Sequence, residues 1–225
     1  MENEFSKVAA LIGDTVRAKI LWALLDGRAY TATELAVYAD TTPSNISMHL
    51  IKLVKAELLT VESQGRHRYY NYARPDISFA IEALANLIPK GNPGKMAITE
   101  SKPVEYCRTC YDHLAGKVGV LLTDSLLKHQ LIHKQNNDFE VSQRGIAWFT
   151  SVGIDLNIVR KRKRSFAKSC LDWSERRHHL SGSLGAALLD NMISNDWMRK
   201  SRNSRAVIIT SKGSTALYEH FQLQA

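Results

Sequence analysis

The chain has 225 residues, of which 44% are hydrophobic and 23% charged, and its formal net charge is +8. This composition is ordinary for a globular protein with room for two modest domains. No apolar run approaches the ~20 residues that cross a bilayer, and no apolar stretch follows Glu2 and Glu4, so we expect neither a membrane span nor a signal peptide. Three cysteines are too few for a disulfide framework, which favours a cytoplasmic protein.

Two helices are predicted at the start of the chain. The first covers residues 6–13, and the second covers residues 14–26, where apolar side chains recur at helical spacing. Gly27 is the expected stop of the second helix.

Residues 31–74 carry the most informative pattern. Thr31 and Glu34 have the spacing of a capping box, which predicts a short helix through about Ala39. After a turn, Thr42 as N-cap and Pro43 as first helical residue begin a second helix. Two runs rich in β-branched and aromatic residues, 58–62 and 69–72, then flank a basic turn and predict a hairpin. Helix, turn, helix and basic hairpin is the order of a winged helix-turn-helix.

These residues resemble those of a known family. The stretch from Pro43 to Leu53, with its Ser-x-His-Leu-x-x-Leu core, and the wing from Gly65 to Tyr70 are similar to the recognition helix and wing of ArsR/SmtB-type bacterial repressors. The resemblance implies a homodimeric transcriptional repressor that binds double-stranded operator DNA. It also implies that the first helix and the helix predicted from Pro75 to about Ile88 form the dimer interface.

The expected DNA contacts follow from this motif. Residues 1–90 carry as many acidic as basic residues, but residues 41–74 hold five basic and two acidic ones, so the motif itself is basic. The side chains expected to face base edges are Ser44, Asn45, Ser47, Met48 and His49. Those expected on phosphates are Lys52, Arg66 and Arg68.

The rest of the chain predicts a linker and a repeated domain. We expect a winged-helix domain over 1–90, a Pro- and Gly-rich linker over 91–103, and a sensing domain over 104–225. The stretch from His113 to Asp124 matches that from His179 to Asp190 at a constant offset of 66 residues.

Each copy, about 104–155 and 170–225, predicts a long helix, a two-stranded hairpin and a short helix capped by Ser142 or Thr210. The fold class is therefore α+β and mainly helical. The segments from Cys110 to Gly116 and from Cys170 to Gly182 resemble the C-terminal extension of a longer subset of ArsR-like regulators. This resemblance implies no particular effector.

The candidate sensing residues lie in this second half. They are Cys107, Cys110, His113, Cys170, Trp173, Arg176 and His179. The first three, at spacings of three, would share one face of a helix, and the pseudo-symmetry would bring the others near. Four readings stay open: a thiol redox sensor, a tetrahedral thiolate–imidazole metal site, a pocket for a small organic effector, and cysteines that are only structural. No metal or cofactor is assigned.

The metal sites typical of the family are absent from the first domain. Where the family carries a Cys-x-Cys, residues 34–39 contain no thiol, and the helix after the wing contains no histidine. An enzyme fused to a winged helix is the weaker class of function, because we find no nucleophile with an evident base. The glycines of 116–119 and 182–185 lie in helical patterns with no preceding strand, which disfavours a phosphate loop. The basic run 160–164 fits a solvated surface or an additional phosphate contact.

Overall fold

The computed structural model describes residues 1–88 and 103–224. The chain divides into two compact units, Met1–Ile88 and Pro89–Ala225, and each is described by itself. The linker expected over 91–103 lies outside the described residues, apart from Pro103. Among the helices of the described part, none is both long and apolar enough to cross a membrane.

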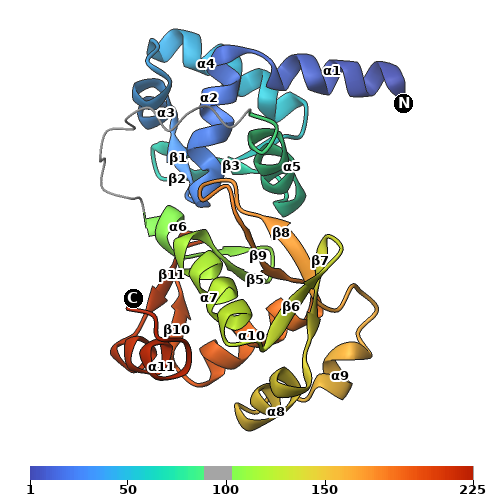
Figure 1. The fold of residues 1–225 in the computed structure, drawn as a ribbon. Coiled ribbons are helices and arrows are strands. Elements are labelled where there is room, and N and C mark those ends of the chain that lie inside the picture. Colours follow the sequence, from blue (N-terminus) through green and yellow to red (C-terminus); the bar gives the residue numbers. More distant parts are fainter. Residues whose placement is uncertain (89–102, 225) are drawn as a thin grey trace. The chain divides into compact units, whose positions relative to one another are not determined.

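The first unit is a winged helix-turn-helix, as predicted (Figure 1). Its helices are α1 (Glu2–Ile12), α2 (Thr15–Ala23), α3 (Ala32–Ala39), α4 (Pro43–Lys55) and α5 (Pro75–Ala85), with a one-turn 3-10 helix at Leu24–Asp26. Its strands are β1 (Tyr30–Thr31), β2 (Leu59–Gln64) and β3 (His67–Tyr72), which form an antiparallel sheet in the order β1-β3-β2. The two-residue strand β1 was not predicted.

Local signals in the sequence fix the helix-turn-helix. Thr31 and Glu34 form the complete capping box of α3, and Thr42 accepts a hydrogen bond from the Asn45 amide at the start of α4. Asp40 ends α3 in a left-handed conformation, with φ of 53°, which turns the chain between the helices. The inner face of α4 is then buried in a core shared with α2 and α3. Its buried residues are Ile46, Leu50 and Leu53.

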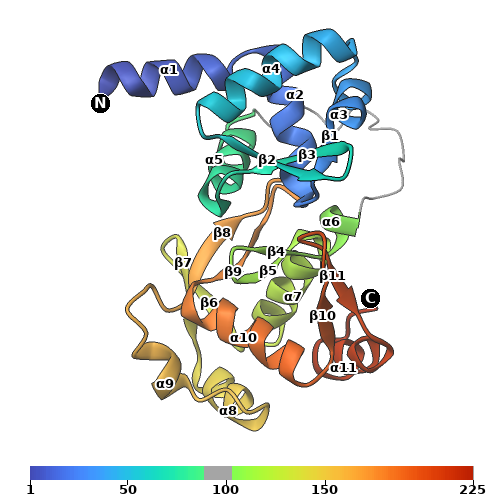
Figure 2. The same cartoon turned by 180° about the vertical axis from the view of Figure 1, so that it is seen from behind.

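The second unit consists of two similar halves (Figures 1 and 2). After α6 (Pro103–Tyr106), the first half contains β4 (Arg108–Cys110), β5 (His113–Ala115), α7 (Gly116–Lys128), β6 (Ile132–Gln135), β7 (Asp138–Val141), α8 (Gln143–Ser151) and α9 (Leu156–Arg160). The second half contains β8 (Lys168–Leu171), β9 (His178–Ser181), α10 (Gly182–Ser194), β10 (Met198–Lys200), β11 (Val207–Ile209) and α11 (Ser211–Phe221). Strands pair antiparallel as four hairpins, β4–β5, β6–β7, β8–β9 and β10–β11.

The predicted long helix, hairpin and short helix occur in each half. Ser142 and Thr210 cap α8 and α11, and each hydroxyl accepts a hydrogen bond at 2.9 Å from a glycine amide three residues on. An additional hairpin, which was not predicted, precedes each long helix. The α+β fold class is thus confirmed, and the first half also has two short helices, α6 and α9, that were not predicted.

The additional hairpin corrects the expected helical face of Cys107, Cys110 and His113. Cys107 precedes β4, Cys110 ends β4 and His113 begins β5, so the three do not share a helix. The helix cannot extend back to them because Gly116 has φ of 77°, and a Cβ there would lie 2.7 Å from the Glu105 carbonyl oxygen. Strand β5 precedes α7, and strand β9 precedes α10. The prediction that no strand precedes the glycines of these helices was therefore wrong.

Gly119 and Gly185 lie in close contact with the strands that precede their helices. A Cβ on Gly119 would lie 2.6 Å from the Leu114 carbonyl oxygen, and one on Gly185 would lie 2.5 Å from that of Leu180. Helix α7 packs on β9 and helix α10 packs on β5, so each long helix lies against a strand of the other half. These contacts between the halves join them in one hydrophobic core.

Candidate functional site

The outer face of α4 presents four of the eight predicted DNA-binding residues to solvent. Ser44, Ser47, Met48 and Lys52 are exposed, and Met48 is 59% exposed. Arg66 and Arg68 are exposed on the β2–β3 hairpin, where Gly65 turns the chain with φ of 60°. A free helix face beside a basic hairpin is the arrangement that reads a major groove and follows the adjacent backbone.

The other two predicted DNA contacts, Asn45 and His49, hold α4 in place. The Asn45 side-chain amide donates to the Thr41 hydroxyl at 2.8 Å. His49 is only 13% exposed, and its Nδ1 lies 3.2 Å from an oxygen of Asp14, the N-cap of α2. Neither side chain projects from the exposed face as expected, because each has a partner at the start of a helix.

Four of the candidate sensing residues meet in the second unit. Cys110 lies opposite His113 across β4 and β5, and Cys170 lies opposite His179 across β8 and β9. Each hairpin therefore contributes one cysteine and one histidine. The two thiol sulfurs and one nitrogen of each imidazole all lie within 4.8 Å of one another. Both histidines are buried, and both cysteines are half-buried.

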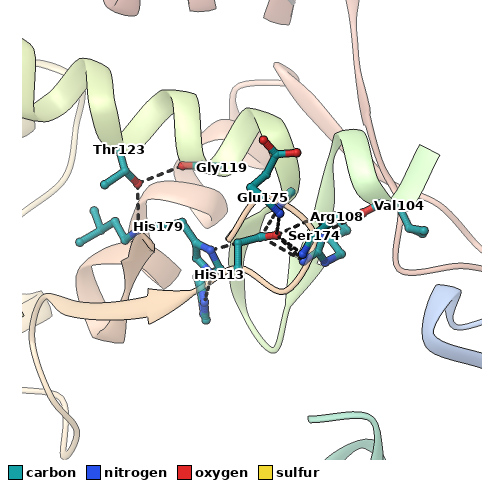
Figure 3. Close-up of polar contacts among 11 residues, drawn as sticks. Val104, Arg108, His113, Gly119, Thr123, Ser174, Glu175 and His179 are labelled. Atoms are coloured by element: carbon teal, nitrogen blue, oxygen red, sulfur yellow. Dashed lines mark hydrogen bonds and ion pairs between the residues drawn. The ribbon is translucent and has the colours of Figure 1, made fainter. Parts of the chain in front are cut away.

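The two imidazoles, of His113 and His179, face each other through one ring nitrogen each (Figure 3). The other nitrogen of each ring lies near a carboxylate. Their Nε2 atoms are 3.0 Å apart. The Nδ1 of His179 lies 3.3 Å from Asp172, and the Nδ1 of His113 lies 3.6 Å from Asp112. Burial lowers the pKa of His179, but Asp172 and Cys110 outweigh burial and raise it.

Asp172 is the centre of the surrounding hydrogen bonds. Both of its oxygens accept from Nη2 of Arg108 at 3.0 Å, and the amide of Gly116 donates to it at 2.7 Å. Ser174 donates to it through both its amide and its hydroxyl. Burial alone would raise the pKa of Asp172, but its contacts with His179 and Arg108 hold that pKa well below the usual range. The carboxylate therefore stays charged in a site where neither it nor Arg108 reaches water.

Known proteins similar to this chain are transcriptional regulators. A family model described as a helix-turn-helix domain matches residues 12–62. The HTH-type transcriptional regulator YdfF of Bacillus subtilis (strain 168) is 40% identical over 225 residues, which is the whole of both chains. The regulator CmtR of Mycobacterium bovis is 31% identical over 87 residues, covering 39% of this chain and 73% of CmtR. The chain belongs to the HTH-type transcriptional regulators.

Two solved structures are similar to part of this regulator. The cadmium sensor CmtR of Mycobacterium tuberculosis, 28% identical, covers 42% of the chain with a TM-score of 0.33. The homodimeric DNA-binding domain Mb0332 of Mycobacterium bovis, 20% identical, covers 36% with a TM-score of 0.34. Membership of the family makes the chain a DNA-binding transcriptional regulator.

The other three candidate sensing residues of the regulator, Cys107, Trp173 and Arg176, lie outside this cluster. Cys107 is 1% exposed, and burial raises its pKa to about 12, so its thiol stays neutral and unreactive. Trp173 covers the Arg108 guanidinium, whose carbon lies 4.7 Å from the ring centre. The amide of Arg176 donates to the Asp172 carbonyl oxygen and closes the loop between β8 and β9.

Sequence reasoning missed Arg108, Asp112 and Asp172. A shared Cys-x-Asp pattern, Cys110 to Asp112 and Cys170 to Asp172, could have identified the two carboxylates. It was hidden because the halves are offset by 60 residues at the cysteines and by 66 at the histidines. The segment from Cys170 to His179 is six residues longer than that from Cys110 to His113, so an alignment anchored on the histidines does not pair the cysteines.

Proposed function

We propose that this regulator is a homodimeric repressor that binds operator DNA through α4 and the β2–β3 wing, and that an effector acting on its second unit controls binding. The exposed face of α4 carries the proposal. Ser44, Ser47 and Met48 project from the helix that reads base edges in winged helix-turn-helix proteins. Lys52, Arg66 and Arg68 would contact phosphates, while Asn45 and His49 would position the helix.

Exposed apolar residues on α1 and α5 support the homodimer. Helix α1 has no buried residue, and Phe5 on it is 73% exposed. Near the end of α5, Leu84, Leu87 and Ile88 are also exposed. Large exposed apolar side chains of this kind are typical of a surface that another protein covers. The family resemblance assigns these same two helices to the dimer interface.

The cluster of Cys110, His113, Cys170 and His179 supports effector sensing by the second unit. Its cysteines are half-buried, in contrast to the fully buried Cys107, and Cys110 lies beside an imidazole. An oxidant such as peroxide could take two electrons and two protons from the two thiols and leave a Cys110–Cys170 disulfide. A ligand of the thiols and imidazoles would act at the same place.

Binding to the promoter of its own operon tests the proposed function. Fluorescence anisotropy would compare that DNA with a scrambled duplex of the same composition, using reduced protein at physiological salt. We expect much tighter binding to the promoter, because specific sites exceed non-specific ones by about 10³-fold or more. Equal affinity for both duplexes would contradict operator recognition.

A paired substitution tests the dimer. Phe5→Glu should shift the protein from dimer to monomer in sedimentation velocity, because it places a charge on the exposed apolar face of α1. Ile158→Glu changes an equally apolar residue, 62% exposed on α9, and should leave the dimer intact. A monomeric wild-type chain at micromolar concentration would contradict the homodimer.

A further inference from the structure

We infer that Cys110, His113, Cys170 and His179 form a tetrahedral binding site for Zn²⁺ that joins the two halves of the second unit. The site goes beyond operator binding and dimerisation, neither of which requires a metal, and it is an alternative to the thiol oxidation proposed for the same two cysteines. Four arguments support it: the ligand set, the spacing of the ligand atoms, the orientation of the imidazoles, and the internal symmetry.

The ligand set is that of a structural zinc site. Two thiolates and two imidazoles are a common donor combination for Zn²⁺, with Zn–S near 2.3 Å and Zn–N near 2.0–2.1 Å. In a tetrahedron these lengths place the donors about 3.3–3.8 Å apart. The observed donors lie within 4.8 Å of one another, and the two Nε2 atoms lie 3.0 Å apart. Side-chain shifts below about 1 Å would therefore complete the coordination.

The orientation of the imidazoles favours a cation between them. The Nδ1 of His179 lies 3.3 Å from an oxygen of Asp172, and that of His113 lies 3.6 Å from an oxygen of Asp112. A carboxylate near Nδ1 favours the Nδ1–H tautomer, which is the tautomer of metal-bound histidines that coordinate through Nε2. With both protons on Nδ1, both Nε2 atoms present lone pairs to each other across 3.0 Å. Two facing acceptors repel unless a proton or a metal ion lies between them. A zinc ion would bind both lone pairs at once.

Internal symmetry supplies every part of the site twice. Each half contributes a cysteine, a histidine on the paired strand, and a carboxylate two residues after the cysteine. Each long helix also places a glycine against the histidine of the other half. A Cβ on Gly119 would lie 3.9 Å from the Cβ of His179, and one on Gly185 would lie 3.2 Å from that of His113. The glycines thus leave room for the two histidines where the halves meet.

A disulfide between Cys110 and Cys170 is the competing use of the same thiols. It would form an S–S bond of about 2.05 Å and would leave both imidazoles outside the bond. The two outcomes differ in metal content and in thiol count, so one set of measurements separates them.

Cobalt substitution tests the site in the full-length protein. Reduced protein freed of metal with a chelator would be titrated with Co²⁺, and visible spectra would report the coordination. We expect one Co²⁺ per chain, with the intense d–d bands of tetrahedral Co²⁺ and a thiolate charge-transfer band, both displaced by equimolar Zn²⁺. Spectra of octahedral Co²⁺ only, or no binding, would overturn the inference.

A matched pair of cysteine variants assigns the ligands. Cys170→Ser should weaken the thiolate band, because Cys110 is then the one thiolate left in the site, and should reduce Zn²⁺ affinity at least tenfold. Cys107→Ala removes a thiol that lies outside the cluster and should leave both unchanged. Equal losses in the two variants would contradict the assigned ligand set.

Protection of the wild-type thiols gives a test that needs no variant. With Zn²⁺ bound under native conditions, alkylation of Cys110 and Cys170 should slow at least tenfold relative to the metal-free protein, as read by peptide mass spectrometry. No protection would overturn the site. A disulfide that forms in air and withstands added Zn²⁺ would assign the thiols to redox sensing instead. Operator binding would be measured separately on the same samples. Failure of the zinc site can therefore be distinguished from failure of the proposed DNA binding.

Discussion

Arg108 and Asp172 form an ion pair that is almost completely withdrawn from water. The Nη2 atom of Arg108 lies 3.0 Å from both carboxylate oxygens, and the two side chains are 1% and 0% exposed. Arg108 begins β4 in the first half, whereas Asp172 follows β8 in the second. The pair therefore crosses the boundary between the halves, beside the imidazole of His179.

Removing one member of this pair should destabilise the second unit strongly. Arg108→Met keeps most of the side-chain volume but leaves the Asp172 carboxylate buried and uncompensated, which costs about 3–5 kcal/mol. Urea unfolding followed by circular dichroism would measure the loss. Arg199→Met breaks an ion pair with Asp196 on the surface and should produce no measurable shift. An equal loss of unfolding free energy in the two variants would contradict the prediction that the buried ion pair contributes more than the exposed one.

A second prediction concerns Asp14, which caps α2 and faces His49. Its carboxylate accepts from the Arg17 amide at 3.0 Å, and this hydrogen bond lowers its pKa from 3.8 against the opposing effect of desolvation. Asp14→Ala should lower the free energy of unfolding of the first unit by about 1 kcal/mol at neutral pH, because the cap is lost.

The pH dependence of this contribution follows from the direction of the shift. Because the pKa in the folded state is depressed, the charge of Asp14 stabilises the fold fully above pH 3.8, and this stabilisation is lost as the pH falls through the folded-state pKa. Asp14→Asn is the matched control, since asparagine caps equally well but does not titrate. The difference in stability between wild type and Asp14→Asn should shrink on acidification. A constant difference down to pH 2 would contradict this account.

The winged helix could be predicted because its signals are local. Thr31 with Glu34, and Thr42 with Pro43, satisfy amides within the same helical turn, so their spacing determines where α3 and α4 begin. The side-chain positions of Asn45 and His49 could not be predicted in the same way. Their partners are set by the turn before α4 and by the cap of another helix.

The hairpins that hold the cluster were missed for a different reason. Strand β4 has three residues, from Arg108 to Cys110, which is too short for an alternating pattern to show. The spacing of Cys107, Cys110 and His113 was therefore equally compatible with a helix. The internal repeat correctly predicted that Cys170 and His179 approach His113. It could not show that Cys107 points into the core, because that depends on how α6 meets β4.

A third prediction separates phosphate contacts from base contacts. Lys52→Ala and Arg68→Ala should each weaken binding to operator and scrambled DNA alike, and should reduce the slope of log affinity against log salt by about 0.9. Ser47→Ala should instead narrow the difference between the two duplexes and leave the salt slope unchanged. Anisotropy titrations at several salt concentrations give both quantities. A loss confined to the operator in Lys52→Ala would refute its phosphate contact.

The last prediction concerns the glycine that faces the histidine cluster. Gly185→Ala would place a Cβ 2.5 Å from the Leu180 carbonyl oxygen and 3.2 Å from the Cβ of His113. Since neither neighbour is the free end of a flexible side chain, the hairpin and helix must separate, at a cost of about 1–3 kcal/mol. Zn²⁺ affinity should fall with stability, because His113 moves.

Gly13→Ala is the control for this change. Gly13 follows α1 with φ of −71°, and a Cβ there would approach nothing nearer than 3.3 Å, so stability should change by less than about 0.5 kcal/mol. Thermal unfolding with and without Zn²⁺ would compare the two variants with wild type. If Gly185→Ala kept both the stability and the Zn²⁺ affinity of the wild type, the close packing of α10 on β5 would not be what positions His113. If it lost stability but bound Zn²⁺ normally, the glycine would serve the fold alone, and the metal site would depend on the hairpins without support from the helices.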